Sequence, residues 1–295
     1  MEPELSTYLD DLLDSARARV AAAAGRESLA DLTARAVEMA PGPSLYDALA
    51  GPGISVIAEV KRASPSKGPI APGLDAVAQA TAYRRGGAAA VSVLTEPTRF
   101  AGSLDDLAAV AATGVPALRK DFLVDPYQVW EARAAGAAAI LLIVAALDDH
   151  QLDLLNEEAR NAGLDVLVEV HDDVEVARAT RLGARIIGVN ARDLRTFELD
   201  RQAFARLRPD LPSGVLAVAE SGISTSEEIR DAAAAGADAV LVGESLVRAA
   251  DPAAALAALV AAGAVTEPAD VPANVPGDAP VGAPSPHPST PNPIA

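Results

Sequence analysis

Residues 135–144 of this chain read Ala-Gly-Ala-Ala-Ala-Ile-Leu-Leu-Ile-Val, a glycine followed at once by an apolar run. The residues before Gly136 are typical of a helix, and a glycine just past a helix end takes the left-handed conformation that closes it. The run Ile140–Val144 is apolar at every position, which is typical of a parallel strand covered on both faces. The stretch therefore predicts a helix that turns directly into a buried strand.

The same order of helix, glycine and strand recurs along the chain, around Gly87, Gly183 and Gly236. The short apolar runs give eight strand candidates, at residues 54–60, 89–94, 115–119, 139–144, 165–170, 186–190, 215–219 and 239–242. Each candidate is followed by a segment that can form a helix, and their starts lie roughly 20–35 residues apart, the length of a βα unit.

Eight such units predict an α/β protein with a single (β/α)8 TIM barrel over residues 49–264. An open, doubly wound sheet is the alternative. Its dinucleotide-binding form is disfavoured, because no Gly-x-Gly-x-x-Gly turn follows the first strand candidate.

The two ends of the chain do not follow the repeat. Residues 1–48 predict an N-terminal extension of two helices that pack on the barrel, with capping-box patterns beginning at Thr7 and Ser28. One of these helices has an apolar stripe formed by Leu9, Leu12, Leu13, Ala16 and Val20. In residues 265–295 proline recurs every few positions, and because proline lacks an N–H and fixes φ, we expect a disordered tail.

Composition argues against several classes of partner and cofactor. The 295 residues have a formal net charge of −17, which disfavours nucleic acid and anionic membranes as partners. The chain has no cysteine, and its first 20 residues contain no signal peptide or long apolar run, so we expect a cytoplasmic protein. No spacing of His, Asp and Glu predicts a metal site. The expected assembly state is a monomer.

Lysine is rare in this chain. Of 24 basic residues only Lys61, Lys67 and Lys120 are lysine. Arginine keeps its charge as a planar fork, whereas a desolvated lysine can lose its proton near neutral pH. Lys61 and Lys120 stand at the ends of strand candidates. We therefore interpret them as positions where the function of the protein requires a lysine and arginine cannot replace it.

Polar residues gather where the strand candidates end, which in a (β/α)8 barrel is where the reacting groups lie. Strand period two places Glu59 and Lys61 on one face. The residues at the strand ends are Glu59, Lys61, Lys120, Glu169, His171, Asn190, Arg192, Glu220, Ser221, Gly222, Gly243 and Glu244. Lysines and carboxylates that share one mouth should shift one another's pKa values, as acid–base catalysis requires.

Structural interpretations of the same residues stay open. Glu59 and Lys61 could form an ion pair with no catalytic role, and Glu169 or Asn190 could be rim residues. His171 is interpreted as a residue of the rim or of a helix start.

Glycine turns at Gly222 and Gly243 follow the last two strand candidates. Many barrels bind a phosphate there, at backbone N–H groups. The side chain of Glu244 is expected to point away from such a phosphate while its N–H contributes.

Several stretches resemble the indole-3-glycerol phosphate synthase family, (β/α)8 enzymes of tryptophan biosynthesis. The longest is Val56-Ile57-Ala58-Glu59-Val60-Lys61-Arg62-Ala63-Ser64-Pro65-Ser66-Lys67-Gly68. Further matches lie at residues 92–96, 100–103, 118–122, 125–128, 167–171, 188–194, 219–223 and 242–246. The resemblance covers about residues 5–262 and reaches every strand end.

The resemblance implies a reaction and a role for each strand-end residue. Members of the family act on anthranilate linked through its nitrogen to deoxyribulose 5-phosphate, and need no redox cofactor or metal. The ring carbon bearing the carboxylate attacks the ketone carbon, and carbon dioxide and water leave. The implied catalytic residues are Lys120 as general acid, Lys61 as an assisting group, Glu169 as general base, Glu59 as a positioning group, and Asn190 and Ser221 as groups that orient the anthranilate part. The implied binding residues are Ser64, Arg192, Glu220, Gly222, Gly243 and Glu244, with Phe100, Phe122 and Leu194 as an apolar slot for the ring.

Three other functions stay open. An isomerase of an aminated sugar phosphate would share the glycine turns without needing two lysines. A Schiff-base aldolase would use Lys61 or Lys120 as a nucleophile, and borohydride would trap its substrate adduct. A catalytically silent barrel would bind a ligand without turnover.

Overall fold

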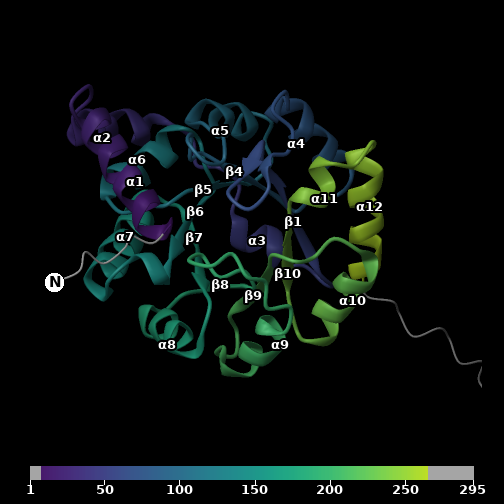
Figure 1. Ribbon diagram of the computed structural model, residues 1–295. Coiled ribbons are helices and arrows are strands. Elements are labelled where there is room, and N and C mark those ends of the chain that lie inside the picture. The colour runs from purple at the N-terminus through teal and green to yellow at the C-terminus, as the bar shows by residue number, and fades with distance from the viewer. Residues whose placement is uncertain (1–7, 265–295) are drawn as a thin grey trace, which may run out of the picture. The chain divides into compact units, whose positions relative to one another are not determined.

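The computed structural model describes residues 8–264 of the chain. Its centre is a closed barrel of eight parallel strands (Figure 1). The strands are β1 (Ser55–Val60), β4 (Ala90–Leu94), β5 (Ala117–Lys120), β6 (Ala139–Ile143), β7 (Asp165–Val170), β8 (Ile186–Asn190), β9 (Leu216–Glu220) and β10 (Ala239–Val242). Neighbours in the chain are neighbours in the barrel, and β1 closes the ring by pairing with both β4 and β10. The predicted (β/α)8 barrel is confirmed, and the open sheet is wrong.

All eight strand candidates are strands, and their bounds agree with the predictions to within two residues. The largest difference is in β5, which begins at Ala117 because Pro116 has no N–H to give to a ladder. The carbonyl of Pro116 still accepts a hydrogen bond from Val91 N at 2.9 Å.

Alternate residues of each strand enter two different cores. Along β6, Leu141 packs with the residues inside the barrel, whereas Ile140 and Leu142 pack against the surrounding helices. Both cores are apolar, so the run that forms β6 is apolar throughout. Gly136 before it has a φ of 78°, the left-handed conformation that closes the preceding helix, and the glycines of the other three repeats do the same.

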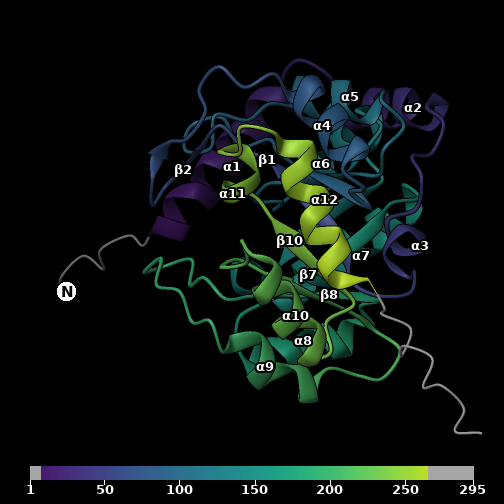
Figure 2. The same ribbon diagram turned by 90° about the vertical axis from the view of Figure 1, so that its right-hand side faces the viewer.

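Helices surround the barrel, as Figure 1 shows. They are α4 (Ala76–Arg85), α5 (Leu104–Ala111), α6 (Pro126–Ala134), α7 (Asp149–Asn161), α8 (Asp173–Leu182), α9 (Ala203–Leu207), α10 (Ser226–Ala234) and α12 (Pro252–Gly263), with a short α11 (Glu244–Val247) and 3-10 turns at Val144–Ala146 and Arg208–Asp210. Figure 2 shows α12 on the outside of the barrel, where it contacts α4 and α10. None of the described helices is long and apolar enough to cross a membrane.

The N-terminal extension has three helices where two were predicted: α1 (Tyr8–Ala24), α2 (Leu29–Glu38) and α3 (Leu45–Leu49). The apolar stripe of α1 is buried or half-buried, as predicted. Ser28 caps α2 by accepting a hydrogen bond from Asp31 N at 3.2 Å. The predicted cap at Thr7 and the predicted tail at 265–295 lie outside the described residues.

The missed helix, α3, covers the N-terminal end of the barrel. Asp165 at the start of β7 accepts hydrogen bonds from Ser44 Oγ at 2.9 Å and from Tyr46 N at 3.0 Å. With five residues, α3 is too short to give a helical period in the sequence.

A small hairpin of β2 (Ala63–Ser64) and β3 (Gly68–Pro69) follows β1. Arg62 ties its base to α5, because its guanidinium binds both oxygens of Asp106. The hairpin places Ser64 and Lys67 beside the C-terminal mouth of the barrel.

Candidate active site

The C-terminal ends of the strands open into one cavity of about 500 Å³. Every residue predicted for catalysis or binding lines it: Glu59, Lys61, Ser64, Phe100, Lys120, Phe122, Glu169, Asn190, Arg192, Leu194, Glu220, Ser221, Gly222, Gly243 and Glu244. Barrel closure thus brings together side chains from all parts of the repeating region.

Lys120 lies between two buried carboxyl groups. Its Nζ is 3.5 Å from Oε2 of Glu169 on β7 and 3.4 Å from Oε2 of Glu220 on β9. Both glutamate side chains are 1% exposed. Gly188 on β8 leaves space for Glu220, because a Cβ at this position would come within 2.0 Å of its Oε1.

Burial and charge set the protonation states of these three groups. Burial raises the pKa of Glu220 to about 8; the charge of Lys120 offsets part of this effect, and Glu169 adds to it. Burial also disfavours the charge of Glu169, but Lys120 and His171 lower its pKa below the usual value. Burial disfavours the charge of Lys120, yet Glu220 and Glu169 raise its pKa. The site thus favours the ammonium form of Lys120 and the ionised form of Glu169, and it shifts Glu220 toward its neutral form.

Desolvation alone would lower the pKa of Lys120 and bring it closer to losing its proton. Its two carboxyl neighbours outweigh the effect of burial on its pKa. The ammonium form is the one that the site stabilises.

The raised pKa of Glu220 predicts a stability effect. Between pH 4.5 and pH 8 the unfolded chain ionises Glu220 while the folded protein keeps it protonated. The folded protein then binds one proton more than the unfolded chain, so the wild type should lose stability as pH rises through this window. Glu220→Gln carries no such proton, so it should gain stability relative to the wild type from pH 5 to pH 8 in urea unfolding. Glu244→Gln, the same change at a more exposed position in the cavity, is the control. Parallel pH profiles for Glu220→Gln and the wild type would contradict the shift.

Glu59 and Lys61 form an ion pair at the end of β1, with 2.5 Å between Oε1 and Nζ. Gly243 gives the pair its space, because a Cβ there would lie 2.5 Å from Glu59 Oε1 and 3.2 Å from Lys61 Nζ. The ion pair considered as a structural alternative therefore exists, but both of its members line the cavity.

Asn190 and Ser221 are joined across two strand ends. Asn190 Oδ1 accepts hydrogen bonds from Ser221 Oγ at 2.7 Å and from Arg192 N at 3.0 Å. Ser221 has a φ of 65°, a left-handed conformation that is uncommon for serine. Strain of this kind persists where the surroundings hold it and is concentrated at functional sites.

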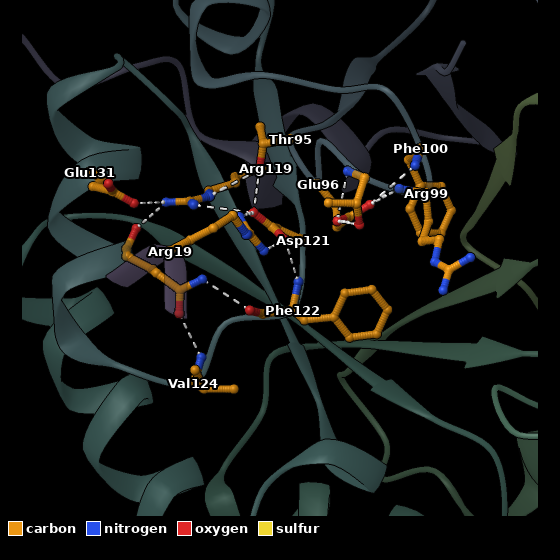
Figure 3. A network of polar contacts seen from close by, with 12 residues as sticks. Arg19, Thr95, Glu96, Arg99, Phe100, Arg119, Asp121, Phe122, Val124 and Glu131 are labelled. Carbon is orange, nitrogen blue, oxygen red and sulfur yellow. Dashed lines mark hydrogen bonds and ion pairs between the residues drawn. The ribbon is translucent and has the colours of Figure 1, made fainter. Parts of the chain in front are cut away.

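Phe100, Phe122 and Leu194 belong to one apolar cluster with the residues inside the barrel. Glu96, which is fully buried, holds the loop that carries Phe100 (Figure 3). Its Oε2 accepts from Arg99 N at 2.6 Å and from Phe100 N at 3.1 Å, and its Oε1 accepts from the N–H and hydroxyl of Thr98. The carboxylate thus accepts the hydrogen bonds of main-chain N–H groups in this loop.

Glu96→Gln should loosen the wall that carries Phe100. The amide has one acceptor oxygen in place of two, so it leaves buried N–H groups unpaired, at a cost of about 1–3 kcal/mol. We expect KM for the substrate to rise several-fold and kcat to change less, measured by steady-state kinetics. Thr98→Val, which removes only the hydroxyl bond, is the control and should have the smaller effect. An unchanged KM in a destabilised Glu96→Gln would contradict the prediction.

Both glycine turns line the cavity. Gly222 has a φ of 77°, and Gly243 precedes the first turn of α11. The side chain of Glu244 is 38% exposed and pairs with Arg248 at 3.0 Å. The guanidinium offsets part of the negative charge of Glu244, so an anion beside the turn is less disfavoured.

Sequence reasoning missed several residues of the site. His171, interpreted as a rim residue, has Nε2 3.5 Å from Glu169 Oε1 and Nδ1 3.0 Å from Glu175 Oε2. Strand period two places His171 on the same face as Glu169, which could have signalled the contact. His171 contacts Glu169 without lining the cavity itself, whereas Arg201 and Arg248 line it, and no pattern in the sequence singles these two out.

These features define the class of the protein: a (β/α)8-barrel enzyme with lysines and glutamates at the strand ends. A model of the indole-3-glycerol phosphate synthase family matches residues 9–259. Proteins of that name from Mycolicibacterium gilvum (strain PYR-GCK) and Mycobacterium avium (strain 104) are 54% and 53% identical to the chain, over 88% of its length and 95% of theirs. The chain belongs to the indole-3-glycerol phosphate synthase family. Its activity is that of a decarboxylating lyase of tryptophan biosynthesis that acts on a small phosphorylated substrate.

A solved structure of a 3-hexulose-6-phosphate synthase is similar to the chain with a TM-score of 0.55. The similarity covers 71% of this chain and 99% of that one at 19% identity. At this identity the likeness shows the barrel fold alone.

Proposed function

We propose that Lys120 is the general acid of the ring closure. The observation that carries this assignment is the position of its Nζ between Glu169 and Glu220 inside the cavity. The ammonium form that this site stabilises is the one that a proton donor needs. As the ring carbon bearing the carboxylate bonds to the ketone carbon, Lys120 gives its proton to the ketone oxygen, which becomes a hydroxyl group.

Decarboxylation follows the new bond. The bond from the ring carbon to the carboxylate breaks, carbon dioxide leaves, and the electron pair restores the aromatic ring. Phe100, Phe122 and Leu194 surround the ring in this proposal. Their low polarity favours a step in which the substrate loses a localised charge.

Loss of water completes the indole. The hydroxyl leaves as water with a proton from Lys61, or from Lys120 once a proton from solvent has restored its ammonium, and Glu169 removes the proton from the carbon next to nitrogen. The lowered pKa of Glu169 keeps it ionised, as a base must be. The raised pKa of Glu220 makes it a weaker competitor than Glu169 for the charge of Lys120.

The remaining predicted residues bind the substrate in this proposal. Lys61, held by Glu59, attracts the carboxylate or the phosphate, and Asn190 and Ser221 orient the anthranilate part. The phosphate is bound by Ser64, Arg192, Gly222, Gly243 and the N–H of Glu244.

The charge of Lys120 disfavours the Schiff-base alternative, because an amine must lose its proton to act as a nucleophile. Borohydride should therefore trap no substrate adduct while turnover proceeds. The cavity of a single chain contains every side chain that the proposed mechanism uses, so the mechanism requires no second copy. This supports a monomer as the working form, which we propose for the cytoplasm.

The test supplies the anthranilate-linked deoxyribulose phosphate and follows indole fluorescence and carbon dioxide release together. We expect one carbon dioxide for each indole formed. Binding without either product would overturn the assignment of a working catalytic site.

A further inference from the structure

The residues on either side of Lys120 are charged and buried, and the mechanism does not use them. Lys120 points into the cavity, so strand period directs the side chains of Arg119 and Asp121 to the other face of the barrel wall, although Asp121 also borders the cavity. Arg119 is 1% exposed and Asp121 is 2% exposed. Charged side chains are rarely buried in this way unless they are paired, so the arrangement calls for a reason.

Asp121 accepts five hydrogen bonds (Figure 3). The guanidinium of Arg19 on α1 binds both of its oxygens at 2.9 Å. Oδ2 also accepts from Thr95 Oγ1 at 2.7 Å and from Arg119 Nη2 at 3.2 Å. Oδ1 accepts from the N–H of Phe122 at 2.8 Å, so the same carboxylate fixes the next residue of the main chain.

Arg119 connects this carboxylate to α6. Its Nε donates to Thr95 Oγ1 at 3.2 Å, and its Nη1 donates to the carbonyl of Gln128 at 2.6 Å and to Glu131 Oε2 at 3.2 Å. Gln128 in turn donates from Nε2 to the carbonyl of Phe122 at 3.0 Å and accepts from Val124 N at 2.8 Å. Side chains therefore hold both the N–H and the carbonyl of Phe122.

These bonds begin where the sheet ends. The ladder between β4 and β5 runs as far as Leu94 and Lys120, and Thr95 N adds one bond to the carbonyl of Lys120 at 3.1 Å. β5 ends at Lys120, so side chains take over the positioning of residues 121–124. The chain is thus fixed on both sides of the proposed acid and at one wall of the ring slot.

We propose that Arg19, Thr95, Arg119, Asp121 and Gln128 form a positioning network for Lys120 and Phe122. The inference rests on the proposed role of Lys120 as general acid. The side chain of Asp121 has no exposed surface and that of Arg119 almost none, so neither meets the substrate. They act by fixing the direction of the Lys120 side chain. A displacement of about 1 Å at a reacting group can cost about 100-fold in rate.

Arg133 offers a matched control. It lies on α6 like the helical partners of Arg119, and it is 7% exposed. Its guanidinium donates to the carbonyls of Met39 and Ala40, which belong to the N-terminal extension and not to the end of β5. Both Arg119→Met and Arg133→Met therefore remove a buried guanidinium. In Arg119→Met the lost group belongs to the network, and in Arg133→Met it does not.

The experiment compares single-turnover rates, KM and urea unfolding for both variants. Arg119→Met should lower the single-turnover rate about 100-fold, and Arg133→Met should leave it within about threefold even where both lose stability. Arg119→Lys, which keeps the charge without the fork, should recover part of the rate. If Arg119→Met does not fold, Thr95→Val replaces it, because this variant removes the shared hydroxyl without unpairing a charge and should lower the rate about tenfold.

Equal rate losses in Arg119→Met and Arg133→Met, or a wild-type rate in Arg119→Met or Thr95→Val, would overturn the network. Lys120→Ala is measured beside them. If Lys120→Ala turns over normally, Lys120 is not the general acid, and the proposed positioning network is then wrong as well. If Lys120→Ala is inactive while Arg119→Met is fully active, the acid stands and only the network is wrong.

Discussion

Replacing Lys120 by alanine is expected to abolish ring closure while the substrate still binds. The variant loses the proton donor at the ketone oxygen, and general acids contribute about 10²–10⁴-fold to turnover. Because ring closure precedes both products, carbon dioxide and indole should disappear together. Substrate binding, measured by titration at equilibrium, should remain, since Lys61 and the turns proposed to bind the phosphate are untouched. Normal turnover would remove Lys120 from the mechanism.

Lys120→Arg separates charge from proton transfer. Arginine can restore a positive charge beside Glu169 and Glu220, so it should recover stability that the alanine variant loses at neutral pH. It should remain severely impaired in turnover, because the planar guanidinium holds its protons too tightly and does not fit an ammonium position. Wild-type activity in Lys120→Arg would show that charge alone suffices.

Glu169→Gln is expected to give the second large effect, a fall of about 10²–10⁴-fold in indole formation. The amide has nearly the same shape as the carboxylate but cannot accept the proton that must leave before the indole forms. Carbon dioxide release comes earlier, so up to one carbon dioxide per site should appear without indole. The measurement is a rapid-quench comparison of the two products.

The outcome for Glu169→Gln discriminates between steps. Blocked release of both products would move Glu169 to the ring closure, and wild-type formation of both would remove it from the mechanism. Glu157→Gln, an exposed change on α7, is the control for the substitution itself and should have no effect.

Local patterns in the sequence were sufficient for the barrel. Gly136 and the run after it predicted a helix closure and a strand, and both exist because glycine conformation and strand period depend on neighbours in the chain. Sequence patterns failed where an element is too short to show a period, or where its hydrogen-bond partner is far away in the sequence. The five residues of α3 show no period, and its anchor, Asp165, is more than 100 residues away.

For the candidate site too, the sequence predicted some properties, and others needed the tertiary structure. Strand ends and the family resemblance were enough to choose catalytic and binding candidates that all line the cavity, although they left out others such as Arg201 and Arg248. They did not give the states of those residues, because a pKa depends on burial and on charges that only the closed barrel brings close. The raised pKa of Lys120, the neutral form of Glu220 and the contact of His171 with Glu169 are of this kind.

The sequence by itself determined that parallel strands form this barrel and that lysines and glutamates stand at their ends, since both follow from the order of residues along the chain. Only the tertiary structure decided that Arg119 and Asp121, on either side of Lys120, belong to one network with a helix that begins at Tyr8. Their side chains are buried, and the partners that make this burial tolerable come from strands and helices that the sequence does not place beside them.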